Sequence, residues 1–258
     1  DMRKWQRAIG KIKRAGKKVK IALVGKYVGN SDAYISVEEA IKTAAGHAGA
    51  KAEIIHVESE TDDVLKKIKT ADGIVIPGGF GKRGIEGKIK AVRFARENNI
   101  PLLGLCLGLQ VAVIEFARNV CGMRNANSTE FDPKTPHPVI DILPSQKGIK
   151  EMGGTMRLGS ATAVLGKNSR VASLYKGNRI AERHRHRYEV NPEYHGKLSK
   201  GGLVLSGINT QDKRLVEFIE LPKHRFFVAT QAHPEFKSRF IEPHPLFLGL
   251  VKAVLGRK

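Results

Sequence analysis

Cysteine and long apolar segments are both scarce in this chain. Of 258 residues only Cys106 and Cys121 are cysteines, and two cysteines exclude the disulfide framework of a small secreted protein. The longest run without a charged residue, residues 98–114, contains Pro101 and is shorter than the roughly 20 apolar residues that a membrane-spanning helix needs. The basic start of the sequence is not followed by the apolar segment of a signal peptide. We therefore expect a cytoplasmic protein without a membrane segment.

Acidic residues are also few relative to basic ones. The chain has 25 aspartates and glutamates against 45 lysines and arginines, which gives a formal net charge of +20. A field of this sign attracts nucleic acid, nucleotides or an acidic protein surface. Because no nucleic-acid-binding motif accompanies the charge, we favour a lysine-rich solvated surface or an acidic partner over a nucleic acid.

The N-terminal half alternates between short apolar strands and helices. This alternation predicts βαβ units, and hence an α/β fold whose parallel sheet has helices on both faces. Ser36 and Glu39 form a capping box, which predicts that a helix follows Ser36. The expected strands are residues 19–25, 52–57, 73–77 and 101–105, and the other expected helices are residues 3–16, 64–68, 85–97 and 107–119.

The C-terminal half has shorter strand-like runs, which suggest an antiparallel extension of the same sheet. These runs are residues 139–143, 160–164, 203–208, 216–220 and 226–231, and a final helix is expected at residues 245–255. Residues 182–190 also look like a strand, crowded with arginine and histidine. Without a repeat or a low-complexity linker, we expect one domain, residues 19–258, after a basic interdomain helix or linker, residues 1–18.

Cys106 lies at a strand-to-helix turn between two glycines, in the sequence GLCLG of residues 104–108. Small flanking residues suit the sharp, strained turn of a nucleophile elbow. The positive end of the following helix would stabilise a thiolate. On this element alone a buried structural cysteine, the commoner case, remains open.

A base for such a nucleophile is present in the sequence HPE of residues 233–235. In an extended segment Glu235 would point to the same side as His233, so that its carboxylate could orient the imidazole. A turn with a surface ion pair is the alternative for this segment.

A glycine-rich loop, residues 77–81, follows the third expected strand. Its backbone N–H groups could hold an oxyanion, as acyl transfer requires. By itself it could also be an ordinary strand-to-helix loop. It lacks the glycine spacing of dinucleotide-binding and P-loop sites.

Taken together, the glycine loop, the GLCLG turn and the HPE sequence resemble the class I, triad-type glutamine amidotransferases. Longer segments narrow the resemblance to the glutaminase domains of the ligases that make CTP from UTP, and it extends from about Val19 to the C-terminus. These segments are residues 25–28, 32–34, 78–84, 125–131, 153–159 and 182–191. The resemblance implies a flavodoxin-like fold.

The resemblance also implies roles for the matched residues. Cys106 would form a γ-glutamyl thioester, His233 would move protons, and Glu235 would orient His233. The N–H groups of Gly79 and Leu107 would hold the oxyanion. The residues implied to bind glutamine are Gly79, Leu107, Gly108, Leu109, Gln110, Glu130 (for the α-ammonium) and Arg187 (for the α-carboxylate).

An effector and a partner domain are implied in the same way. Phe80 and Arg83, beside the oxyanion glycines, would contact GTP as an allosteric effector. No cofactor or metal is implied in this domain. ATP and Mg²⁺ would act on a synthetase (amidoligase) domain that this sequence lacks, so the chain is expected to be part of a longer protein that forms a homotetramer.

Two alternatives to a ligase-bound glutaminase stay open at this stage. One is a free-standing glutaminase or γ-glutamyl hydrolase that uses the same residues. The other is a catalytically silent, basic nucleic-acid-binding module, against which the intact triad argues. We expect His184 and His186 to be surface or interface residues rather than zinc ligands, and Cys121 to have no role.

Overall fold

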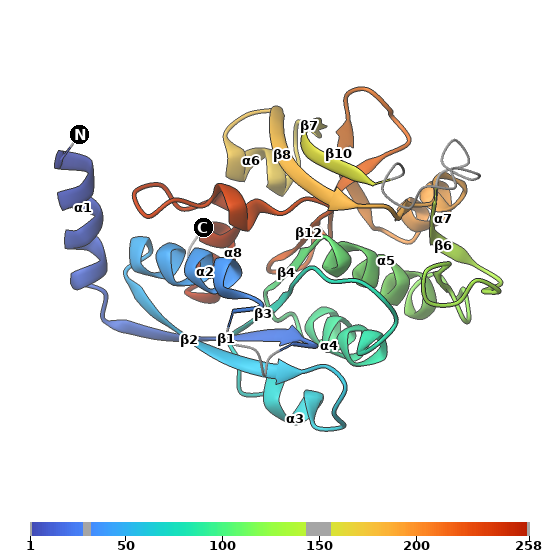
Figure 1. Ribbon diagram of the computed structural model, residues 1–258, viewed down its shortest axis with the longest axis horizontal. Helices are drawn as coiled ribbons and strands as arrows, with labels where there is room; N and C mark the ends of the chain where they lie inside the picture. The colour runs from blue at the N-terminus through green and yellow to red at the C-terminus, as the bar shows by residue number, and fades with distance from the viewer. Residues whose placement is uncertain (1, 28–31, 143–155, 257–258) are drawn as a thin grey trace.

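A nine-stranded mixed sheet forms the centre of the molecule, in the order β2-β1-β3-β4-β12-β11-β10-β7-β8 (Figure 1). The structure, a computed structural model, describes residues 2–27, 32–142 and 156–256. The first five strands of this order are parallel and have the strand order of flavodoxin-like folds. They are β2 (Ala50–Glu58), β1 (Lys17–Gly25), β3 (Gly73–Ile76), β4 (Leu102–Leu105) and β12 (Phe227–Thr230).

The other four strands extend this sheet beyond β12, and each runs antiparallel to its neighbours. They are β11 (Val216–Glu220), β10 (Val204–Asn209), β7 (Arg157–Leu165) and β8 (Arg179–His186). The expected α/β fold with an antiparallel extension is therefore confirmed. The expectation that residues 226–231 belong to that extension is wrong, because they form β12, which runs parallel to β4.

Helices cover both faces of the sheet. Successive residues of a strand point to opposite faces, so each strand contributes apolar side chains to both. In β1, Ile21 and Leu23 belong to the apolar core on one face, and Ala22 and Val24 to the core on the other. The first face is covered by α2 (Ile35–His47), α6 (Arg170–Tyr175) and α8 (Pro245–Val254). The second face is covered by α3 (Val64–Ile68), α4 (Ile85–Glu97) and α5 (Leu107–Asn119).

A separate small sheet corrects part of the sequence analysis. It consists of β5 (Asn127–Ser128), β6 (Pro138–Asp141) and β9 (Glu189–Val190). The expectation that residues 139–143 extend the main sheet is wrong, because β6 pairs with β5 and β9 instead; residue 143 lies outside the described part. Residues 182–190 are likewise divided between β8 of the main sheet and β9 of the small one.

The start of α2 also differs from the expectation. The helix begins at Ile35 with Tyr34 at its N-cap, no side chain caps it, and Ser36 lies inside the first turn. Tyr34 is buried, and its hydroxyl accepts a hydrogen bond from the Lys26 N–H at 3.1 Å. A Cβ on Gly25 would lie 2.5 Å from the Tyr34 ring. Tertiary packing of Tyr34 therefore replaces the capping box that the sequence predicts.

Helix α1 (Met2–Lys13) lies at one end of the molecule (Figure 1) and packs against α2, where a Cβ on Gly46 would lie 2.5 Å from the Ile12 side chain. It ends before the predicted residue 16, and β1 already begins at Lys17. Trp5 stacks on Phe240 with ring centroids 5.3 Å apart. Within the described ranges, no helix combines the length and the apolar character needed to cross a membrane.

Candidate active site

Cys106 occupies the turn between β4 and α5, with φ 51° and ψ −101°. A non-glycine residue with positive φ is strained, and such strain is typical of functional turns. The two flanking glycines allow the turn to pack closely. A Cβ on Gly108 would lie 2.3 Å from the Ile76 carbonyl oxygen, and one on Gly104 would lie 2.9 Å from the backbone of Gly108. The nucleophile-elbow geometry predicted from GLCLG is thus present.

The surroundings of Cys106 come from the end of β12 and from β8. The Cys106 N–H donates to the carbonyl of Thr230, the last residue of β12, at 2.8 Å. The sulfur lies 3.8 Å from Nε2 of Gln231 and 3.9 Å from the carbonyl oxygen of Arg185. Leu107 is the first residue of α5, so its N–H has no acceptor within the helix and can donate to a bound group.

His233 and Glu235 are joined by a hydrogen bond of 2.7 Å between Nδ1 and Oε1. The HPE segment is not extended as expected, because Pro234–Lys237 forms a 3-10 turn. The turn still brings the carboxylate onto the imidazole. The His233 N–H donates to the Arg183 carbonyl at 2.8 Å, and the Phe236 ring stacks on the imidazole at 5.6 Å. His233 is therefore fixed by its backbone, its ring face and its Nδ1.

Opposing effects act on the His233 imidazole. Burial lowers its pKa, but the facing Cys106 sulfur and the Glu235 carboxylate raise it to about 10. The ring is therefore protonated at neutral pH when Cys106 is a thiolate. Nε2 is buried and makes no hydrogen bond to any described residue, so it can exchange a proton with a substrate.

The glycine loop after β3, residues 77–81, lies against Cys106 and His233. A Cβ on Gly78 would lie 2.8 Å from Cε1 of His233 and 3.6 Å from Cβ of Cys106. Only glycine fits there. A pocket of about 270 Å³ is lined by Gly78, Gly79, Arg185 and His233, among others. Nucleophile, base and oxyanion loop, which are far apart in the sequence, therefore meet at one edge of the sheet.

The residues expected to bind glutamine surround this point, although several already have protein partners. Glu130 Oε1 accepts a hydrogen bond from the Gly81 N–H at 2.6 Å, and burial raises the pKa of Glu130 while the nearby charge of Arg187 opposes the rise. Gln110 is buried and donates to the Tyr188 carbonyl at 3.1 Å. The Leu109 side chain lies in the apolar core, so only its backbone can reach a ligand.

Phe80 and Arg83 lie on the outer side of the glycine loop. Phe80 is 47% exposed and lines the pocket that holds His233. The guanidinium of Arg83 lies 5.9 Å from the centre of the Tyr27 ring and 3.6 Å from Glu60. Both side chains are thus accessible to a planar, negatively charged ligand.

A buried charged cluster, absent from the sequence predictions, packs beside the triad. Arg157 bonds to Glu189 at 2.9 Å and to Glu217 at 2.7 Å. His184 lies 3.5 Å from Glu217 and 3.1 Å from His186. Both histidines are buried, which corrects their expected surface position. A clue was present in β11, where Glu217 lies between the apolar residues Val216 and Phe218.

The electrostatics of this cluster favour a structural role. Burial, reinforced by Arg157, lowers the pKa of His184 to about 3 and that of His186 well below its usual value. Burial also raises the pKa of Glu189 to about 8, against the opposing effect of Arg157. The histidines are therefore neutral at neutral pH and supply hydrogen bonds rather than charge.

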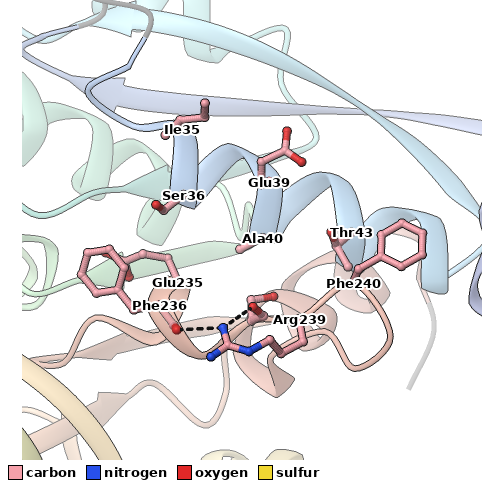
Figure 2. Close-up of a pocket in the computed structure, with 10 residues that line it drawn as sticks. Ile35, Ser36, Glu39, Ala40, Thr43, Glu235, Phe236, Arg239 and Phe240 are labelled. Carbon is pink, nitrogen blue, oxygen red and sulfur yellow. Dashed lines mark hydrogen bonds between the residues drawn. The ribbon is translucent and has the colours of Figure 1, made fainter. Parts of the chain in front are cut away.

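A second hollow, of about 460 Å³, lies between α2 and the turn that carries Glu235 (Figure 2). Ile35 and Glu39 project from the α2 side, and Phe236 and Arg239 from the opposite side. The Arg239 guanidinium donates to the Phe236 and Ser238 carbonyls, both at 3.1 Å. Gly78, Gly79 and His233 line the smaller pocket and not this hollow, so we place the reaction in the smaller pocket.

Cys121 lies at the opposite end of α5 from Cys106. It follows α5, its sulfur lies 3.7 Å from the Lys197 carbonyl, and burial raises its pKa. It is a poor nucleophile at neutral pH.

Comparison with known proteins assigns the chain to a family. The model of the family "Glutamine amidotransferase class-I" matches residues 30–253. The CTP synthase of Caldanaerobacter subterraneus is 54% identical over an alignment that covers all of this chain and 48% of that protein. The CTP synthase of Methanocaldococcus jannaschii is 52% identical, with 100% of this chain and 49% of that protein covered. The chain thus spans about half the length of these relatives.

A solved structure extends the comparison to three dimensions. The Trypanosoma brucei CTPS glutaminase domain with bound acivicin is 41% identical, with a TM-score of 0.87, and the match covers 93% of this chain and 95% of that one. Of the segments that carry the resemblance, residues 28 and 153–155 lie outside the described residues. The chain belongs to the class I glutamine amidotransferase family, and within it to the glutaminase domains of the CTP synthases.

Proposed function

We propose that this domain hydrolyses L-glutamine to glutamate and ammonia, with Cys106, His233 and Glu235 as the catalytic triad. The observation that supports this most directly is the meeting of three elements at one sheet edge. These are the strained Cys106 turn, the imidazole bonded to Glu235 at 2.7 Å, and the Gly78–Gly79 backbone packed against that imidazole.

The first half-reaction follows from these positions. The Cys106 thiolate attacks the carboxamide carbon of the glutamine side chain, and the carbonyl electron pair moves onto oxygen. The N–H groups of Gly79 and Leu107 would hold this oxyanion. The C–N bond then breaks, and Nε2 of His233 gives its proton to the departing nitrogen, which leaves as ammonia. A γ-glutamyl thioester on Cys106 remains.

The second half-reaction regenerates the enzyme. Water attacks the thioester carbon, and His233, now neutral, accepts the proton of that water. The C–S bond breaks, which releases glutamate and restores the thiolate facing a protonated imidazole. Glu235 holds the imidazole through Nδ1 and stabilises its positive charge in both steps.

The ammonia would serve a synthetase domain that aminates UTP to CTP with ATP and Mg²⁺, in a longer, homotetrameric protein. The first test is glutamine-dependent ammonia release by this chain alone and with a separately produced synthetase domain. Release that depends on the synthetase domain supports the proposal. Equally fast release of glutamate from γ-glutamyl peptides, without any response to that domain, would instead indicate a γ-glutamyl hydrolase.

Arg187 is expected to select the α-carboxylate of glutamine, because a guanidinium pairs with a carboxylate through two charge-assisted hydrogen bonds. Arg187→Ala should raise KM for glutamine by about 10- to 100-fold, the loss expected for hydrogen bonds to a charged group. Steady-state ammonia release measures this. Arg179→Ala, an exposed arginine of β8, is the control. An unchanged KM would assign Arg187 to the domain interface or to structure.

Phe80 and Arg83 are expected to mediate activation by GTP. The lone domain should be a poor glutaminase, because ammonia without an acceptor is wasted, and GTP together with the synthetase domain should stimulate it. A nucleotide over Phe80 would fix the adjacent Gly79 N–H, which faces the oxyanion. Phe80→Ala should lose the stimulation, and Leu158→Ala, an exposed residue of β7, should keep it. Full activity of the lone domain, unaffected by either addition, would contradict this coupling.

A further inference from the structure

Lys88 of α4 is completely buried, and its ammonium nitrogen makes no hydrogen bond to any described residue. It stands on the apolar face of the helix, three residues after Ile85 and four before Val92, both of which are buried. A buried ammonium without a hydrogen-bond partner is costly. A lysine in such a position is retained either because a neighbouring group offsets the cost of burying its charge or because that charge contributes to function.

The position of the Lys88 ammonium nitrogen indicates that its charge acts on the glycine loop. It lies 3.7 Å from the place that a Cβ on Gly79 would take, directly against the loop that would hold the oxyanion. Lys26 approaches the same place, with its Cε at 4.0 Å, and its ammonium donates to the Phe80 carbonyl. Two lysine side chains therefore converge on the glycine loop.

The groups that face Lys88 come from three other elements. Burial and the charge of Lys26, just after β1, lower the pKa of Lys88 to about 8, although Glu58 at the end of β2 and the Cys106 sulfur oppose the decrease. Glu58 makes no hydrogen bond to the ammonium, and its buried Oε1 has no partner among the described residues. The positive charge is therefore not cancelled by direct contact with a carboxylate.

We propose that Lys88 is a positioning residue whose buried positive charge, behind Gly79, stabilises the Cys106 thiolate and the oxyanion formed on the substrate. In an apolar interior the field of one charge is weakly screened and acts beyond hydrogen-bond range. The assignment rests on the proposed glutaminase function, since it needs Cys106 as the nucleophile.

Lys88→Met tests this role, because methionine preserves most of the side-chain volume and removes the charge. We expect kcat for glutamine to fall roughly tenfold, less than the loss of about 10²-fold or more for a direct oxyanion donor, with KM nearly unchanged. Alkylation of Cys106 by iodoacetamide at pH 7 should also slow several-fold. Lys90→Met, an exposed lysine of the same helix, should match the parent in both measurements.

The pH dependence gives a readout that a purely structural lysine would not change. In the parent, kcat should decline as the pH rises through about 8, where Lys88 loses its proton, and this decline should be absent from Lys88→Met. Glu58→Gln removes a carboxylate that favours the protonated lysine, so the decline should move to lower pH. This second variant keeps the test decisive if Lys88→Met does not fold.

The outcomes separate this inference from the proposed function. A Lys88→Met protein with the kcat and alkylation rate of Lys90→Met would overturn the role of Lys88, whatever its Tm. A parent that does not release ammonia under any condition would contradict the glutaminase proposal, while the alkylation rates would still report on Lys88 and Cys106.

Discussion

Replacing Cys106 by alanine or serine is expected to abolish glutamine hydrolysis, with a loss of roughly 10⁴-fold or more, as for other catalytic nucleophiles. No other group at this edge of the sheet can form the thioester. The fold should survive, because the strained turn is held by backbone contacts to Thr230 and by the close packing of Gly108 on Ile76. Ammonia release measures the loss, and circular dichroism verifies the fold.

Two further measurements make this result specific. A glutamine-analogue electrophile should label the parent and Cys121→Ser, but not Cys106→Ala; labelling that persists and maps to Cys121 would refute the assignment. In addition, the pKa of His233 should fall in Cys106→Ala from its raised value of about 10, since the facing sulfur is one of its causes. Proton NMR of the imidazole measures this shift.

His233→Ala is expected to remove activity almost completely, whereas Glu235→Gln should reduce it by a smaller factor, on the order of 10²-fold. The imidazole must give and accept a proton in each turnover and has no substitute. The glutamine amide can still accept the Nδ1–H hydrogen bond, but it cannot stabilise the positive charge of the ring. Single-turnover measurements of ammonia release and of thioester breakdown separate the two half-reactions.

The control for this series is His56→Ala, an exposed histidine of β2, which should leave the rate unchanged. A His233→Ala protein as active as the parent would contradict the triad. A Glu235→Gln protein as impaired as His233→Ala would show that the carboxylate does more than orient the imidazole.

The parallel strands β1 to β4 and the nucleophile turn follow from the sequence, because both depend on local signals. The fifth parallel strand, β12, does not, since its residues look like part of the antiparallel extension. Apolar runs separated by helices predict β1, β3 and β4. The glycines around Cys106 predict a tight turn, and the structure shows why glycine is needed there, since Gly108 packs closely on the backbone of Ile76. The pairing of Cys106 with His233 was predictable only through the joint pattern of motifs. Spacing alone does not reveal that β4 and β12 are neighbours.

Features set by tertiary contacts could not be predicted in this way. The capping box at Ser36 is overridden by Tyr34, whose packing on Gly25 lies outside any local pattern. His184 and His186 look like surface residues in a charged strand, but they become buried because Arg157 and Glu217 of neighbouring strands complete their cluster. The role of Lys88 could not be predicted for the same reason, since it depends on the contact of its side chain with the Gly79 loop.

The adjacency of β4 and β12 has a mechanical consequence for regulation. The two strands are joined by a parallel ladder from Phe227 and Leu102 to Thr230 and Leu105. Cys106 follows Leu105 directly, and His233 lies three residues after Thr230. Sliding one strand along the other would break several backbone hydrogen bonds at once. The backbones that carry the sulfur and the imidazole are therefore held by the sheet and, at His233, by the hydrogen bond from its N–H to the Arg183 carbonyl. A signal from another domain has to switch the glycine loop or admit the substrate, and cannot work by drawing the catalytic pair together.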